Sequence, residues 1–106
     1  MRIIKQKTLE RYWNIPRYRK AEQSLKAWLK EAKTAEWSSS ADVKAKYKNA
    51  SIINSERVVF NICGNSYRLI VAIRYDFKIV FIKYFGTHSE YDEVDAATVE
   101  EHDPKS

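Results

Sequence analysis

The sequence predicts an α+β domain in which helices cover one face of a mostly antiparallel sheet. The first observation is that residues 58–91 hold three runs of β-branched and aromatic residues. Short turns at Gly64-Asn65 and Asp76-Phe77 separate these runs, and this pattern is typical of a three-stranded meander of hairpins. The second observation is an apolar stripe at three- and four-residue spacing after Pro16, which predicts an amphipathic helix.

The two turns set the expected register of the meander. If each is a two-residue loop, the residues that face one another follow by counting outward from the turn. The predicted pairs are Asn61–Arg68, Phe60–Leu69, Ile82–Val71 and Lys83–Ile70. A slip of one residue would move every side chain to the opposite face, so the assignment depends on both turns.

Side chains alternate between the two faces of a strand. One face of the predicted meander is apolar and needs a cover: Val58, Phe60, Ile62, Tyr67, Leu69, Val71, Ile73, Val80, Ile82 and Tyr84. The other face is cationic: Arg57, Asn61, Arg68, Arg74 and Lys83, among Val59, Ile70, Ala72, Phe81 and Phe85. We therefore expect one core face and one face suited to an anionic partner.

The N-terminal half supplies the remaining elements. Residues 2–4 are β-prone and are expected to pair with the meander as an N-terminal strand, followed by a short helix over residues 8–13. The helix after Pro16 carries the stripe Ala21, Leu25, Trp28, Leu29 and Ala32, which is the natural cover for the apolar face. Ser39 is a candidate cap for another short helix through residues 43–47, and residues 51–54 are a candidate strand.

Charge is divided unevenly along the 106 residues, whose net charge is +5. From His88 onward seven acidic residues stand against Lys105 alone, so that end carries −6 and residues 1–87 carry +11. A net charge of +11 on residues 1–87 favours a polyanionic partner, most commonly nucleic acid. We predict a single domain over residues 1–93 and an acidic, frayed C-terminal tail over residues 94–106.

Several kinds of site are not predicted. No apolar run reaches the roughly 20 residues that span a bilayer, and no leader is visible, so we expect a cytoplasmic protein without membrane contact. The chain has only two glycines, too few for a glycine-rich phosphate-binding loop. Its single cysteine, Cys63, is expected to be a buried structural residue. With only two histidines besides, the sequence predicts neither a metal site nor a cofactor. Two classes of function remain open: metal-free acid–base chemistry on an anionic substrate, and binding without chemistry.

A capping box is predicted just after the last strand. Thr87 is the cap and Glu90 follows three residues later. His88 would begin the helix and Tyr91 would project from the same side one turn on. The alternative is that His88 is a surface residue and Tyr91 a packing residue.

Two motifs of the meander resemble a known family. They are Phe60-Asn61-Ile62-x-Gly64-Asn65-x-Tyr67-Arg68-Leu69 and Thr87-His88-x-Glu90-Tyr91-Asp92, and together they are similar to the HigB-type toxins of the RelE superfamily. The resemblance extends to about Val94. It implies a RelE-like α+β fold and a toxin that cleaves mRNA, often in the ribosomal A site. It also implies neutralisation by a helix-turn-helix antitoxin, with operator DNA contacted only through that antitoxin.

Cleavage of RNA without a metal proceeds by attack of a 2′-hydroxyl on the adjacent phosphate, which requires a base, an acid and cations. In that light, the catalytic candidates are Arg68 and Lys83 for the phosphorane charge, His88 as acid or base, and Tyr91 for base stacking or proton transfer. The RNA-binding candidates are Asn61, Arg57 and Arg74. Which group acts as base stays open.

Two other functions are compatible with the same residues. The basic face could serve a non-catalytic RNA- or ribosome-binding module. Alternatively, exposed apolar residues such as Phe81 and Phe85 could dock a protein partner.

Overall fold

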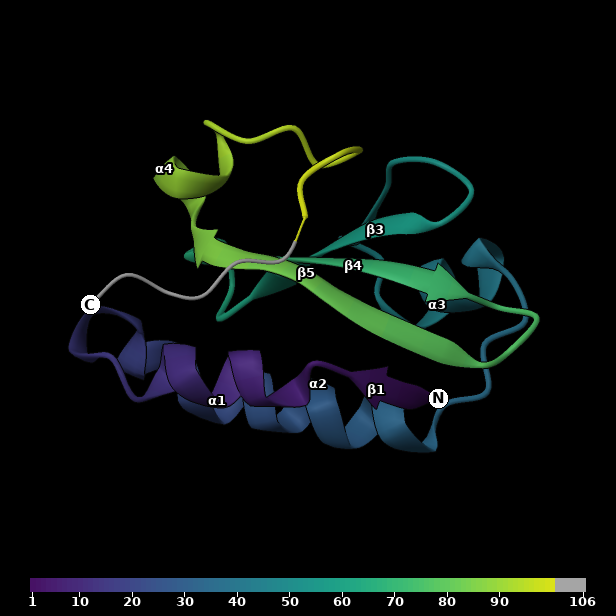
Figure 1. The fold of residues 1–106 in the computed structure, drawn as a ribbon, viewed down its shortest axis with the longest axis horizontal. Coiled ribbons are helices and arrows are strands. Elements are labelled where there is room, and N and C mark those ends of the chain that lie inside the picture. The colour runs from purple at the N-terminus through teal and green to yellow at the C-terminus, as the bar shows by residue number, and fades with distance from the viewer. Residues whose placement is uncertain (101–106) are drawn as a thin grey trace.

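The computed structural model describes residues 1–100. The elements along the chain, drawn in Figure 1, are β1 (Arg2–Ile4), α1 (Gln6–Trp13), the 3-10 helix η1 (Pro16–Ala21), α2 (Glu22–Thr34), α3 (Ser40–Lys46), β2 (Ser51–Ile52), β3 (Arg57–Ile62), β4 (Tyr67–Arg74), β5 (Ile79–Thr87) and α4 (His88–Tyr91).

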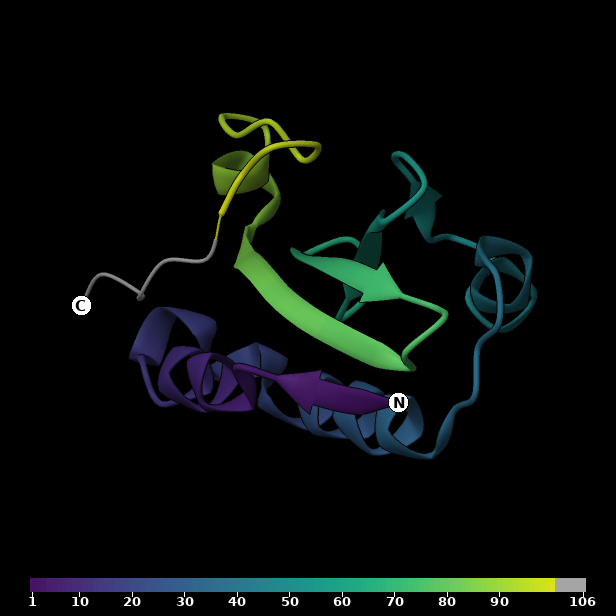
Figure 2. The same cartoon turned by 45° about the vertical axis from the view of Figure 1, so that its right-hand side comes forward.

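Five strands form a single sheet in the order β1-β5-β4-β3-β2. Strand β1 runs parallel to β5, and every other neighbouring pair is antiparallel. Helices α1 and α2 lie side by side under one face of the sheet, and α4 lies on the opposite side (Figure 2). The predicted α+β fold, with an N-terminal strand added to a C-terminal meander, is confirmed.

The main core lies between the sheet and the helices α1 and α2. All five residues of the predicted stripe on α2 and η1 are buried: Ala21, Leu25, Trp28, Leu29 and Ala32. The Trp28 ring meets Phe60 of β3 edge-on, with 5.3 Å between ring centroids. Burying a large apolar side chain contributes about 1.5–3 kcal/mol, so this stripe holds α2 in place.

A β-bulge in β5 corrects the predicted register. The pairs Asn61–Arg68, Phe60–Leu69 and Val71–Ile82 occur as predicted, but Ile70 pairs with Tyr84 rather than Lys83. Lys83 is therefore the extra residue of a bulge, which is a local insertion that a simple count from the turn cannot anticipate.

The bulge exchanges the faces of the next two residues. Phe85, predicted for the cationic face, lies in the main core with its ring 5.2 Å from Tyr12 and 5.5 Å from Tyr67. Tyr84, predicted for the core face, packs instead with Val59 on the opposite side of the sheet. Because Phe85 is buried, the idea that it docks a protein partner is wrong.

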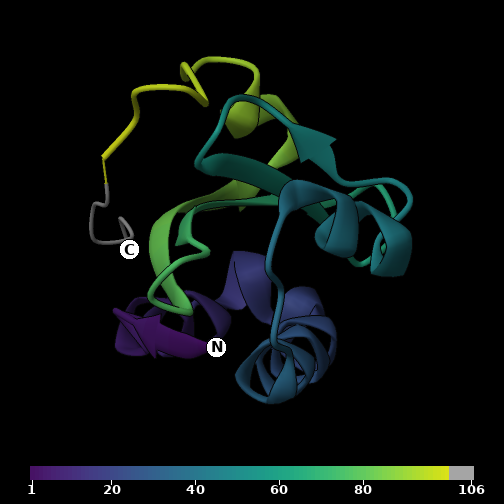
Figure 3. The same ribbon diagram turned by 90° about the vertical axis from the view of Figure 1, so that its right-hand side faces the viewer.

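A second apolar cluster covers part of the face that was predicted to be cationic. Val59, Ile70 and Tyr84 are buried there by partly buried residues from the C-terminal end: Tyr91, Val94, Ala96 and Val99. Residues 94–100, which we name the C-terminal strap, cross the sheet on the side opposite α1 and α2 (Figure 3). The expectation of a frayed tail is wrong for the strap, and residues 101–106 lie outside the described part of the chain.

Two local expectations are also corrected. Ser39 precedes α3 as predicted but makes no side-chain cap; the Asp42 carboxylate instead accepts a hydrogen bond from the Ser38 backbone N–H at 2.8 Å. Cys63, expected to be buried, is exposed in the β3–β4 turn, where its φ is +55°. The turn places its side chain outside the core.

Candidate functional site

The short helix α4 is held at the end of β5 by the predicted capping box. The Thr87 backbone N–H donates to Glu90 Oε1 at 2.8 Å, and the Glu90 backbone N–H donates to Thr87 Oγ1 at 3.2 Å. His88 is the first residue of the helix and Tyr91 lies three residues on, which places both on the same side of a single turn. The capping box is confirmed.

Glu90 also ties α4 to the helical layer. Its carboxylate accepts a hydrogen bond from Tyr18 Oη at 2.9 Å and lies 3.2 Å from Arg17 Nη2. Burial acts to raise the pKa of this carboxyl, but the Thr87 hydrogen bond, the Tyr18 hydroxyl and the Arg17 charge outweigh it and hold the pKa below its usual value. Burial, together with the hydrogen bond to Glu90, raises the pKa of Tyr18 to about 12.

Sequence reasoning missed Arg17 and Tyr18 as partners of this helix. Tyr18 is 72 positions from Glu90, and no local pattern links the two. The capping box explained why an acid stands at Glu90 but gave no sign of this second, tertiary role.

His88 has a partner of its own on α4. Its Nδ1 lies 3.2 Å from Asp92 Oδ2, and both side chains are about half exposed. The His88 backbone N–H donates to the Ser66 carbonyl at 3.1 Å, which joins α4 to the β3–β4 turn. A carboxylate on Nδ1 orients the ring and leaves Nε2 as the nitrogen that can exchange a proton with a ligand.

Arg68 reaches α4 from β4. Its guanidinium carbon lies 5.9 Å from the centre of the Tyr91 ring, within the range of a cation–π contact. Nη1 donates to the Asn65 carbonyl at 3.0 Å and the Tyr67 carbonyl at 3.1 Å, and Asn61 is the backbone pairing partner on β3. Arg68, Tyr91 and α4 thus form one cationic and aromatic corner, which also carries His88.

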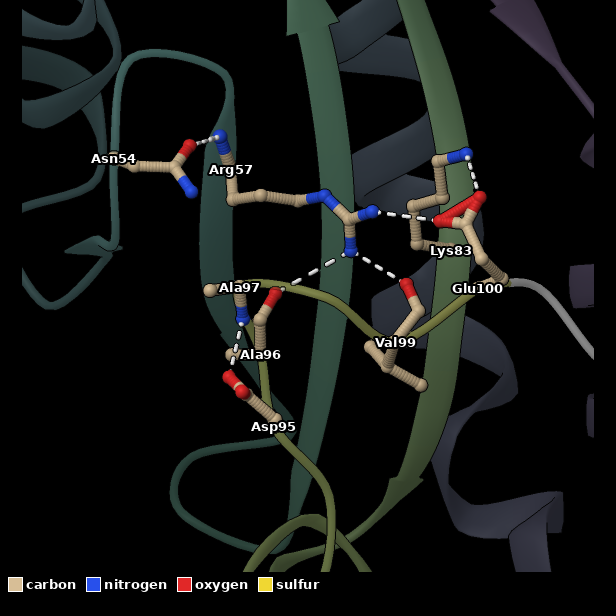
Figure 4. A network of polar contacts seen from close by, with 8 residues as sticks. All are labelled: Asn54, Arg57, Lys83, Asp95, Ala96, Ala97, Val99 and Glu100. Carbon is tan, nitrogen blue, oxygen red and sulfur yellow. Dashed lines mark hydrogen bonds and ion pairs between the residues drawn. The ribbon is translucent and has the colours of Figure 1, made fainter.

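A second group lies further along the same face. Arg57 on β3 and Lys83 at the bulge of β5 both contact the Glu100 carboxylate, with Arg57 Nη2 at 2.8 Å from Oε2 and Lys83 Nζ at 3.2 Å from Oε1 (Figure 4). Lys83 precedes Gly86, the pairing partner of Arg68, by three residues, or about 10 Å of strand. Lys83 therefore groups with Arg57 rather than with Arg68.

Arg74 is separate from both groups. It ends β4 at the hairpin turn, where Nη2 lies 3.2 Å from Asp76 Oδ2 and the guanidinium carbon lies 5.0 Å from the centre of the Phe77 ring. Arg74 pairs with Ile79 at the start of β5, whereas α4 follows the end of that strand. The predicted site residues are thus divided among three places on the sheet.

Among residues 1–100, no group of three or more His, Cys, Asp or Glu side chains is arranged to hold a metal ion. Within the same residues, none of the helices has the length and apolar character required to cross a bilayer.

Comparison with known families decides the class of protein. The family model for HigB toxins, described as the RelE-like toxic component of a toxin–antitoxin system, matches residues 21–94. The chain belongs to the HigB toxin family. The match covers α2, the meander and α4, and so includes every element that carries the Arg68–Tyr91–His88 corner. Among curated proteins no significant match was found.

The family establishes the biological setting in outline. A HigB toxin is the toxic component of a toxin–antitoxin system, so this HigB family member has a cognate antitoxin as a partner. The α+β architecture, with helices under one face of a five-stranded sheet, is compatible with the RelE-like fold that the family description names.

Proposed function

We propose that this HigB family toxin is a metal-independent endoribonuclease that cleaves mRNA on the ribosome. Membership of a RelE-like toxin family supports this reaction class. The observation that carries the proposal is the corner where Arg68 lies against the Tyr91 ring beside His88, on the basic side of the sheet. Metal-free phosphodiester cleavage requires cationic charge and proton transfer, which the guanidinium and the imidazole supply, and the phenol adds a ring for stacking or a second group for proton transfer.

In the proposed reaction, a 2′-hydroxyl loses its proton to a base and attacks the adjacent phosphorus. The bond to the 5′-oxygen breaks, that oxygen takes a proton from an acid, and a 2′,3′-cyclic phosphate remains. Arg68 stabilises the charge of the phosphorane, since a guanidinium binds two phosphate oxygens and keeps its proton. His88 exchanges a proton through Nε2, and Tyr91 stacks on a base or shares the proton transfer.

The remaining candidates bind RNA. Lys83 is a catalytic candidate from the sequence, but its contact with Glu100 supports a role beside Arg57 in holding the phosphate backbone. Arg74 extends the positive charge to the far end of β4, and Asn61 offers an amide beside Arg68. Contacts of this kind raise affinity for any strand and make binding depend on salt.

We further propose that the cognate antitoxin is a helix-turn-helix protein, that operator DNA is reached only through it, and that the toxin acts in the cytoplasm. The first two statements follow from the family resemblance of the two meander motifs, and the third follows from the ribosome as the proposed target.

The experiment that tests the function uses purified toxin with translating ribosomes and a defined mRNA. Primer extension should reveal cuts at defined positions, and these cuts should disappear when purified antitoxin is added in excess. If the toxin is retained on ribosomes while the mRNA stays intact, the protein is a binding module rather than a nuclease.

A further inference from the structure

The C-terminal strap carries an acid into the middle of the basic face. Arg57 and Lys83 project from β3 and β5, on either side of β4, and meet at the two oxygens of the Glu100 carboxylate (Figure 4). Each cation binds a different oxygen. The two non-bridging oxygens of a phosphodiester can accept the same arrangement of donors, a guanidinium on one and an ammonium on the other.

We propose that Arg57 and Lys83 form a phosphate-binding site for RNA and that Glu100 occupies this site in the free toxin. The inference rests on the proposed function and adds a regulatory step to it. RNA must displace the Glu100 side chain before its backbone can reach the two cations. The site is therefore closed by an intramolecular competitor.

The burial of the three side chains shows which of them can move. The Arg57 side chain is 10% exposed and that of Lys83 is 20% exposed, whereas Glu100 is 67% exposed. The two cations are thus built into the surface, while the carboxylate approaches from outside. An exposed carboxylate can swing into solvent at little packing cost.

The strap builds the site as well as closing it. Arg57 Nη1 donates to the backbone carbonyls of Ala96 and Val99, so the guanidinium is fixed with Nη2 turned toward Glu100. Val99 is itself anchored, since it packs against the apolar cluster and its N–H donates to the Asp95 carbonyl at 2.8 Å. Release of Glu100 alone would therefore leave an oriented guanidinium ready for a phosphate.

The charge state of Glu100 agrees with this role. The hydrogen bonds from Lys83 and Arg57 hold the pKa of its carboxyl below the usual value, so it is ionised at neutral pH. A neutral amide of the same shape should compete far less well with phosphate. Glu100→Gln is therefore the variant that opens the site while leaving the strap in place.

The test measures binding of a short, single-stranded 2′-O-methyl RNA, which lacks the nucleophile and stays intact. Fluorescence anisotropy would compare full-length wild type with Glu100→Gln and with the matched control Glu36→Gln. Glu36 is an exposed acid on the α2–α3 loop, so both variants lose one negative charge. At low salt we expect Glu100→Gln to bind about two- to fivefold more tightly than Glu36→Gln, the size of effect that exposed ion pairs produce. The difference should fade at high salt.

A second pair of variants assigns the gain to the cations. In a Lys83→Gln background, the Glu100→Gln substitution should give a clearly smaller gain, because one of the two cations it would release is absent. Equal affinities for Glu100→Gln and Glu36→Gln would overturn the inference, as would a gain that is undiminished without Lys83. Failure of RNA binding by Glu100→Gln at every salt concentration would overturn it too. Failure of the nuclease proposal is a separate result, seen as uncut mRNA on ribosomes.

Discussion

Arg68 links the positive charge of the sheet to the aromatic ring of α4. In the proposed mechanism its guanidinium stabilises the phosphorane, and loss of one such donor typically lowers the rate about 10²–10³-fold. We expect Arg68→Ala to slow single-turnover cleavage of ribosome-bound mRNA by that factor without a change in melting temperature. Arg74→Ala removes the same charge from the other end of β4 and should weaken binding only. Equal loss of cleavage rate in the two variants would remove Arg68 from the active site.

His88 is the residue that we expect to carry a proton. General acid–base groups contribute about 10²–10⁴-fold, so His88→Ala should slow cleavage within that range and remove one limb of the pH–rate profile. Asp92→Asn keeps the imidazole and removes only the carboxylate that orients Nδ1. It should therefore cost less than the loss of the ring. An unchanged rate and profile for His88→Ala would identify His88 as an ordinary surface residue.

The placement of α4 depends on the contact of Glu90 with η1. Glu90→Gln should lower the free energy of unfolding by about 1–3 kcal/mol at neutral pH, because the Tyr18 and Arg17 contacts lose their charged partner. The folded-state pKa of Glu90 is depressed, so its contribution is present above the ordinary carboxyl pKa of about 4.3 and is lost as the pH falls through the folded value.

Denaturant melts of wild type and Glu90→Gln across a pH series would measure this contribution. The difference in unfolding free energy should shrink toward acid pH. Tyr18→Phe, which removes only the hydroxyl, is the companion variant and should also destabilise the fold. A difference between wild type and Glu90→Gln that stays constant with pH would show that the Glu90 charge does not support α4.

How far the sequence predicted the fold differs between elements. The meander could be predicted because Gly64-Asn65 and the β-rich runs are local signals, and the register of β3 with β4 follows directly from that turn. The bulge at Lys83 could not, because neither Lys83 nor Tyr84 carries a local mark such as glycine. One extra residue was enough to exchange the faces of Tyr84 and Phe85.

The site could be predicted only in part, because only some of its features are local patterns in the sequence. The Thr87–Glu90 capping box is a four-residue pattern, so the position of His88 and Tyr91 on α4 could be derived. The contacts of Glu90 with η1 and of Glu100 with Arg57 join segments 72 and 43 positions apart. Non-local contacts of single charged residues leave no periodic pattern, and the strap was therefore mistaken for a frayed tail.

The C-terminal strap packs as part of the folded domain. Removing residues 94–106 would uncover Val59, Ile70 and Tyr84 and release Arg57 from its carbonyl partners. We expect this truncation to lower the free energy of unfolding by about 1–3 kcal/mol, the scale of burying one large apolar side chain. A variant that ends at Glu100 is the reference for the comparison. Identical melting temperatures would contradict the packing of the strap.

The chemistry of the cut ends distinguishes attack by a 2′-hydroxyl from other ways of cutting RNA. Attack by a 2′-hydroxyl leaves a 2′,3′-cyclic phosphate on one fragment and a 5′-hydroxyl on the other, and it requires the 2′-oxygen of the scissile nucleotide. We predict these ends on mRNA cut by the toxin on ribosomes, and no cut when that nucleotide alone is 2′-deoxy. Cleavage of the 2′-deoxy mRNA at an unchanged rate would contradict the proposed reaction.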